Sequence, residues 1–199
     1  KGGSNAALLQ PFVPLLLSFS GRSEMKTLTQ VEAAGAALKL RGDRLFSAMY
    51  LNELLMRLLH RHDPHPSLFA SYGNALGQLT EAGSVEAVLR RFELGLLDEL
   101  GYSFSLQADG LSGEGLDAAG WYHYHPDHGL VAGRAATDPV RPAYSGKDLL
   151  ALARGEFDGP ARGTARRLLR QALAVHLGDA PLKSRDLFRG RHPGAGEKQ

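Results

Sequence analysis

Cysteine is absent from the 199 residues of this chain. Disulfide bridges, thiolate metal sites and a thiol nucleophile are therefore excluded. Long apolar runs are also missing, because no stretch reaches the roughly 18 residues that a membrane-spanning helix needs. No secretory leader is visible, so we expect a cytoplasmic protein with no membrane partner.

The sequence also has none of the short motifs that mark common enzyme classes. A phosphate-binding loop of the G-x-x-x-x-G-K-[ST] type, a dinucleotide fingerprint and a G-x-S-x-G elbow are all absent. The neighbouring carboxylates Asp98 and Glu99 fall in a helical segment, where adjacent side chains point in different directions. We therefore expect neither enzymatic activity nor a cofactor.

What the chain does have is an uneven distribution of charge. The whole sequence carries a net charge of only +2. Residues 161–199 hold nine basic and three acidic side chains, a local net charge of +6, so the remainder is net negative. This asymmetry is typical of a surface that binds phosphates or acidic peptides, although a solvated basic tail has the same composition.

The spacing of apolar residues predicts both strands and helices. A β-hairpin is expected near the start, with one strand from Leu15 and another over 25–31. Helices are expected over 43–60, 66–81 and 84–100, then from Ser145 and over 164–177. Strands over 121–125 and 130–134 follow a loop rich in glycine and aspartate, which indicates a small β insertion.

The clearest helix lies between Ser84, which can cap its start, and Gly101, which can adopt the left-handed conformation that ends it. Glu93 lies close to its apolar face, where a carboxylate needs a partner. Arg90 and Arg91 diverge by about 100°. Arg90 lies nearer to a second apolar strip, as a groove for an acidic, apolar-tipped peptide would require. The simpler interpretation is a core helix with solvated arginines.

Three histidines in the segment Y-H-Y-H-P-D-H form a possible metal site. His123 and His125 alternate along a predicted strand and share a face, and His128 or Asp127 follows in the turn. Such sets bind zinc and other first-row metals, so a metal-dependent hydrolase is an alternative function. However, no further ligand has an obvious spacing, and exposed histidines in a hairpin would explain the same pattern.

The C-terminal third carries two further basic segments. Arginines at spacings of three and four on one helix predict a stripe that could follow DNA phosphates: Arg162, Arg166, Arg167 and Arg170. Beyond that helix, Lys183 and Arg185 interleave with apolar residues that include Leu182. Such a mixture suits an acidic peptide with apolar ends, or nucleic acid.

Four blocks of sequence carry a specific resemblance. They read L-L-Q-P-F-V-P-L-L-L-S-F-S-G-R-S-E-M-K-T-L at 8–28, Y-L-N-E-L-L at 50–55, L-R-R-F-E-L-G-L-L-D-E-L-G-Y at 89–102 and P-L-K-S-R-D-L-F-R at 181–189. In this order they resemble the recombination mediator RecO family. Together the blocks extend over almost all of the chain from Ala7 to Arg189.

The resemblance implies an α+β fold with an N-terminal OB-fold barrel and an α-helical domain that contains a small zinc-finger-like β insertion. We expect a partial OB-fold over 1–40, helical segments over 41–106 and 144–190, the insertion over 107–143, and a flexible tail over 191–199. Because the chain begins at Lys1 and not at methionine, we expect the first strands of the barrel to precede it.

The resemblance also implies a non-enzymatic role in recombinational repair by the RecF pathway, in the cytoplasm and at the nucleoid. The family binds single- and double-stranded DNA, anneals complementary strands, and with RecR helps to load RecA onto DNA coated by single-stranded DNA-binding protein (SSB). Arg22, Lys26 and the arginine stripe are the expected DNA contacts. Arg90 matches the family position for the acidic SSB tail, with Leu182, Lys183 and Arg185 beside it.

Two departures from the family pattern matter. Many relatives carry a four-cysteine zinc site in the insertion, whereas the segment after Tyr102 has no cysteine, so we expect an insertion without zinc. The loop before Q-P-F, at 1–6, has few of the basic residues that are usual there. Some of the DNA-binding surface is therefore expected to be missing from this sequence.

Overall fold

The computed structural model describes residues 8–22, 24–135, 142–178 and 180–189, and it divides into two compact units. Unit 1 is Lys1–Leu40 and unit 2 is Arg41–Gln199. Each unit is described by itself. The tail expected over 191–199 lies outside the described residues.

Unit 1 contains an antiparallel hairpin of β1 (Leu15–Ser20) and β2 (Thr27–Ala33), and its register shifts between Ser18 and Phe19. The hairpin leaves large apolar side chains in solvent, including Leu16 at 63% and Phe19 at 58% exposure. Within the described part of unit 1 this two-stranded sheet is the only sheet. A closed OB-fold barrel is therefore not confirmed.

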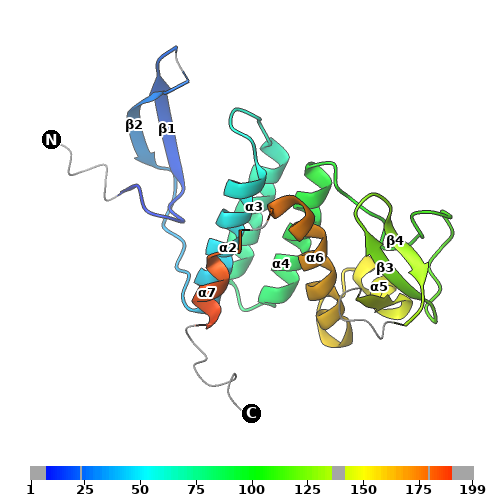
Figure 1. Cartoon of the computed structure of the whole chain (residues 1–199). Coiled ribbons are helices and arrows are strands. Elements are labelled where there is room, and N and C mark those ends of the chain that lie inside the picture. The colour runs from blue at the N-terminus through cyan, green and yellow to red at the C-terminus, as the bar shows by residue number, and fades with distance from the viewer. Residues whose placement is uncertain (1–7, 23, 136–141, 179, 190–199) are drawn as a thin grey trace. The chain divides into compact units, whose positions relative to one another are not determined.

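Unit 2 is built on four long helices (Figure 1). They are α2 (Asp43–Leu58), α3 (Pro66–Thr80), α4 (Val85–Glu99) and α6 (Arg162–Leu177). Their apolar stripes meet in a core of fully buried leucines: Leu51, Leu54, Leu79, Leu96, Leu168, Leu169 and Leu173. The sequence periodicity predicted these helices to within two residues at each end, because each stripe faces this one core.

Helix α4 begins and ends as its sequence predicts. The Ser84 hydroxyl accepts a hydrogen bond from the Ala87 N–H at 3.2 Å. Gly101 has a φ of +78°, the left-handed conformation that a residue without Cβ adopts easily. The two adjacent arginines diverge: Arg90 is 6% exposed, whereas Arg91 is exposed and lies over the Phe157 ring.

The β insertion is a three-stranded antiparallel sheet in the order β4-β3-β5. Its strands are β3 (Trp121–His125), β4 (Gly129–Gly133) and β5 (Ala143–Ser145). The sequence predicts β3 and β4 but not β5, which is too short to show a period. Helix α5 (Gly146–Ala153) begins directly after β5, where the Ser145 hydroxyl accepts a hydrogen bond from the Asp148 N–H.

The chain returns to the helical core after the insertion. A 3-10 turn, η1 (Gly159–Ala161), leads into α6, and α7 (Ser184–Arg189) packs against α2. Within unit 2, the sheet and α7 lie at opposite ends of the helical core (Figure 1). None of the helices in the described ranges is both long and apolar enough to cross a bilayer.

Candidate anion-binding surface

A buried ion pair lies at the centre of the helical core. Arg90 Nη1 is 2.7 Å from Glu93 Oε2, and the Tyr50 hydroxyl on α2 donates to Glu93 Oε1 at 2.6 Å. Glu93 is completely buried. Oε1 therefore accepts a hydrogen bond and Oε2 faces the Arg90 charge without a hydrogen bond, and the expected pairing of Glu93 with a nearby basic residue is confirmed.

The environment of Glu93 alters the protonation of this centre. Burial raises the pKa of Glu93, while the Arg90 charge and the Tyr50 hydrogen bond oppose that rise without cancelling it. Burial, together with the nearby Glu93 carboxylate, also raises the pKa of Tyr50 well above its usual value. The positive charge of Arg185 on α7 acts to lower the pKa of both groups.

All four arginines of the predicted α6 stripe are exposed. Arg162, Arg166 and Arg170 are exposed and follow one another at intervals of four residues, and we call them the α6 arginine row. Arg162 lies 3.7 Å from Glu86 on α4. Arg167 lies on a neighbouring face of α6, where its charge acts on Tyr144 of β5.

The pKa of Arg170 in the α6 arginine row depends on burial and on charges from α4, α6 and α7. Burial and the nearby charges of Arg185, Arg166 and Arg90 lower the pKa of Arg170. Arg185 is half-buried and Lys183, which precedes it, is exposed. We refer to Arg166, Arg170, Lys183 and Arg185 as the α6–α7 basic surface. This set includes residues that the sequence assigned to two different ligands.

Two side chains of α2 hold the segment that carries Lys183 and Arg185. The Glu53 carboxylate accepts hydrogen bonds from the Lys183 and Ser184 N–H groups, each at 2.8 Å, and from the Ser184 hydroxyl at 2.6 Å. The Arg57 guanidinium donates to the carbonyls of Leu177 and Pro181. Sequence reasoning missed both residues, because their partners lie at least 120 positions away.

Partial burial works to raise the pKa of Glu53, but other contacts outweigh it. The hydrogen bonds from Ser184 and Lys183 and the charge of Arg57 hold the pKa of Glu53 below its usual value. The carboxylate is therefore ionised at neutral pH, and it fixes the start of α7 beside α2.

The residues expected to bind an acidic tail differ in accessibility. Arg90 and Leu182 are buried, at 6% and 3% exposure. Arg90 also faces Glu86 at 3.3 Å, in addition to Glu93. Lys183 and Arg185 can contact a ligand at the surface, whereas the buried Arg90 can act on such a ligand only through its charge.

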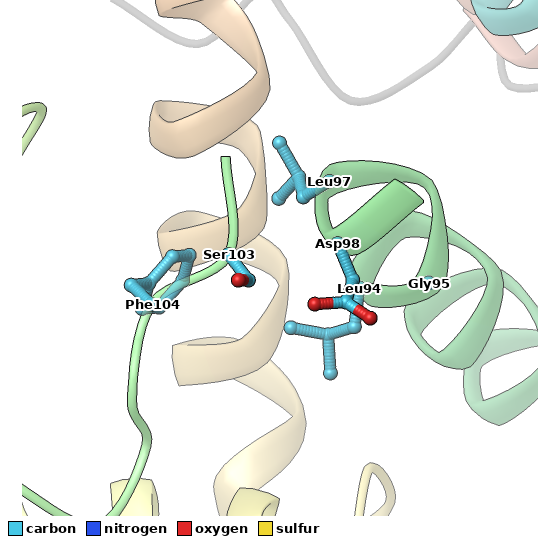
Figure 2. A pocket seen from close by; sticks show the side chains of 6 residues that line it. All are labelled: Leu94, Gly95, Leu97, Asp98, Ser103 and Phe104. Atoms are coloured by element: carbon cyan, nitrogen blue, oxygen red, sulfur yellow. The ribbon is translucent and has the colours of Figure 1, made fainter. Parts of the chain in front are cut away.

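The apolar strip beside Arg90 forms part of a pocket of about 310 Å³. Figure 2 shows Leu94, Leu97 and Asp98 on α4 and, across from them, Ser103 and Phe104 on the following segment. Its lining residues include the Asp98 carboxylate and no basic side chain. An acidic peptide would be repelled there, so this pocket is a poorer site for such a ligand than the α6–α7 basic surface.

The two expected DNA contacts in unit 1 lie at the turn of its hairpin. Arg22 is exposed, and the Lys26 ammonium donates to the Gly21 carbonyl at 2.9 Å. Nothing in these contacts prevents either side chain from binding phosphate.

The histidines of the insertion do not form a metal centre. The His123 ring is 3.2 Å from the Pro142 carbonyl, while His125 and His128 stack with their ring centroids 4.8 Å apart. Among the residues that the structure describes, no three histidine or carboxylate side chains are grouped so as to hold a metal ion. The hydrolase alternative has no support.

Comparison with known sequences identifies the family. The family model described as "Recombination protein O C terminal" matches residues 40–186. The chain belongs to the RecO family of DNA repair proteins. It is 48% identical over 193 residues to a DNA repair protein RecO of Pseudomonas putida (strain W619), covering 96% of this chain and 82% of that relative.

Other relatives give the same result. The chain is 46% identical to a DNA repair protein RecO of Methylococcus capsulatus (strain Bath), over 92% of this chain and 75% of the relative. It is 43% identical to the protein of the same name from Pseudomonas aeruginosa (strain LESB58), over 95% of this chain and 80% of that relative. The family resemblance read from the four sequence blocks is thus confirmed, and with it a role in DNA repair and recombination.

Proposed function

We propose that this RecO family chain is a non-enzymatic repair mediator that binds single- and double-stranded DNA, anneals complementary strands, and acts at the nucleoid in the cytoplasm. In this proposal it also binds the acidic C-terminal tail of SSB. With RecR, it helps to load RecA onto SSB-coated single strands. In this proposal the hairpin of unit 1 is part of an OB-fold.

The α6 arginine row, three exposed arginines spaced four residues apart on one helix, is the observation that carries this proposal. Arg166 and Arg170 lie about one turn apart on α6, and burial together with the charges of Arg185 and Arg166 lowers the pKa of Arg170. Like charges held together destabilise one another unless an anion neutralises them. Phosphates and carboxylates are the anions that arginine binds best, since its fork can donate two parallel hydrogen bonds.

The α6 arginine row suits a DNA backbone. An α-helix rises about 1.5 Å per residue, so the row presents a cation about every 6 Å along α6. Contacts of this kind neutralise phosphates without reading the base sequence. Annealing requires that two anionic strands approach each other, and neutralisation lowers the repulsion between them. Arg22 and Lys26 extend the proposed DNA surface, as does Arg167.

An acidic tail fits the α7 end of the surface. Lys183 and Arg185 face the ligand, and Leu182 anchors them from the core. Arg90 supplies positive charge behind them and is held by Glu93. The proposal therefore places direct contact on Arg185 and Lys183, with Arg90 in a supporting role.

An annealing assay on complementary oligonucleotides, with and without SSB, tests the overall function. We expect the chain to accelerate annealing of bare strands and to retain that activity when SSB coats them. A chain that binds DNA but leaves the annealing rate unchanged would be a plain DNA-binding adaptor, contrary to the proposal.

Peptide titration tests the tail site separately. The probe is a fluorescent peptide of four aspartates followed by a phenylalanine with a free carboxylate. We expect Arg185→Ala to weaken its binding at least tenfold, because a charge-assisted contact contributes about 1.5–3 kcal/mol. Arg91→Ala, which removes an exposed arginine from α4, is the control and should have no effect. Equal affinities for wild type and Arg185→Ala would contradict the assignment.

A further inference from the structure

We propose that one face of the insertion sheet is a stacking platform for unpaired nucleobases, so that the chain holds a single strand by its bases as well as by its phosphates. This face carries Trp121, His123 and His125 of β3, and we call it the outer face. The inference rests on the proposed function, because it adds a second contact site for single-stranded DNA to the α6 arginine row.

The two faces of β3 differ in exposure. Tyr122 and Tyr124 are buried, whereas Trp121 is 41% exposed and the His125 side chain is 51% exposed. Alternate residues of a strand point to opposite faces, so the three side chains of the outer face lie on the side away from the buried tyrosines. Tryptophan is highly buried on average in folded proteins. A half-exposed indole on a regular strand therefore indicates a contact surface.

The His123 ring lies between the two neighbouring strands. Its Nδ1 is 3.2 Å from the carbonyl oxygen of Pro142, which directly precedes β5. On the β4 side, a Cβ added to Gly133 would lie 2.2 Å from His123 Cδ2, so only glycine leaves room for the ring there. The imidazole is thus fixed at both edges, and position 133 presents no side chain that could cover the outer face.

The opposite end of β3 from Trp121 carries a second ring surface. The His125 and His128 rings stack with their centroids 4.8 Å apart and an angle of 29° between their planes. Both residues are exposed. Aromatic rings stack on bases of any type, because every base has a π-face. The outer face therefore offers rings for stacking along the whole of β3.

The spacing of these rings suits a single strand and not a duplex. Alternate residues of a strand lie about 6.6 Å apart, which is about twice the 3.4 Å rise of one strand in double-stranded DNA. Bases in a duplex cover each other at that rise and cannot stack on the protein. An extended single strand separates its bases, so that each ring can stack one base. The outer face should therefore discriminate unpaired bases from paired ones.

The charge near Trp121 complements a phosphate backbone. Trp121 pairs across the sheet with one residue of β4 and one of β5. Arg134 directly follows the first of these partners, Lys147 lies two residues after the second, and both are exposed. Within the described part of the sheet and its connecting turns, Asp127 is the one acidic residue, and it lies at the other end of β3. Rings flanked by cations favour nucleic acid over an apolar protein segment as the ligand.

Trp121 is the only tryptophan in the sequence, so its fluorescence reports on the outer face alone. The full chain is titrated with an oligothymidylate, and a parallel titration follows binding through the anisotropy of a dye on the DNA. We expect Trp121 emission to fall as the DNA binds, and quenching by acrylamide, which is uncharged, to weaken about twofold or more. An abasic strand of the same length, which has the phosphates without the bases, should leave both readings unchanged. A blunt-ended duplex should do the same.

A variant separates stacking from phosphate contact. Trp121→Ala should weaken oligothymidylate binding about fivefold or more, because a base loses its aromatic partner. The slope of log affinity against log salt should not change, since no charge is removed. Affinity for the duplex should also be unchanged. Phe69→Ala removes a 77% exposed ring from α3 and is the matched control, which should bind as wild type does.

The outcomes separate this inference from the function beneath it. If the oligothymidylate binds while Trp121 emission and acrylamide quenching stay as in the unbound chain, the inference is wrong and the proposed function stands. Equal losses of single-strand and duplex affinity in Trp121→Ala would also contradict it. If the wild-type chain binds no DNA, the proposed function is wrong and the inference falls with it.

Discussion

At the scale of single residues, the adjacent Arg90 and Arg91 have very different environments. Arg90 points into the core, where it is 2.7 Å from Glu93, while Arg91 lies in solvent over the Phe157 ring. Their divergence could be predicted from the helical period. The burial of Arg90 could not, because its buried partnership depends on Tyr50, 43 positions before Glu93 in sequence.

Arg90→Ala should therefore lower the free energy of unfolding much more than Arg91→Ala. Removing one partner of a buried ion pair leaves an uncompensated carboxylate and costs about 3–5 kcal/mol. Losing a cation–π contact at an exposed site costs about 0.5–1 kcal/mol. Urea unfolding followed by circular dichroism measures both values. Equal losses would show that the Arg90–Glu93 pair does not stabilise the core.

Two glycines provide a further contrast at this scale. A Cβ on Gly110 would lie 1.5 Å from the His128 carbonyl oxygen, whereas a Cβ on Gly73 in α3 would meet nothing within 4 Å. Gly110→Ala should lower the free energy of unfolding by about 1–3 kcal/mol through overpacking. Gly73→Ala should raise it by up to about 1 kcal/mol, because alanine favours the helix. Thermal melts of the two variants should shift in opposite directions, and a shift in the same direction would contradict this packing.

At the scale of elements, α7 is held mainly from outside its own six residues. At its start, the Glu53 carboxylate accepts hydrogen bonds from two backbone N–H groups and one hydroxyl. The sequence indicates an apolar-basic segment there but not a helix docked on α2. Such docking depends on a side chain 130 positions earlier in the chain. By contrast, α2, α3, α4 and β3 were predictable because their own apolar periods specify them.

The attachment of α7 should depend on pH in one direction. The folded-state pKa of Glu53 is lower than its unfolded value, so its contribution is complete above the unfolded pKa and is lost as pH falls through the folded pKa. Hydrogen exchange of residues 180–189 should accelerate, after correction for intrinsic rates, as pH falls below about 4.5. Glu53→Gln should already show fast exchange at pH 7. Identical protection in wild type and variant would contradict this role.

At the scale of the whole molecule, the charge asymmetry of the sequence becomes a located surface. Residues 161–199 carry a net charge of +6 in a chain of net +2. In the structure, part of that excess forms the α6–α7 basic surface at one end of unit 2. The sequence predicted the basic residues and the family. It did not predict the contacts by which Glu53 and Arg57 hold the segment before α7.

The salt dependence of DNA binding tests this central claim most directly. The measurement is the affinity for an oligothymidylate at several salt concentrations, for wild type, an Arg166→Ala/Arg170→Ala double variant, and Arg154→Ala. Arg154 is an exposed arginine paired with Glu156 outside this surface, and its replacement should leave the salt slope unchanged. Each phosphate contact to a single strand contributes about 0.7 to the slope of log affinity against log salt, so the double variant should lose about 1.4. A double variant with the affinity and slope of wild type would show that DNA does not bind at the α6–α7 basic surface.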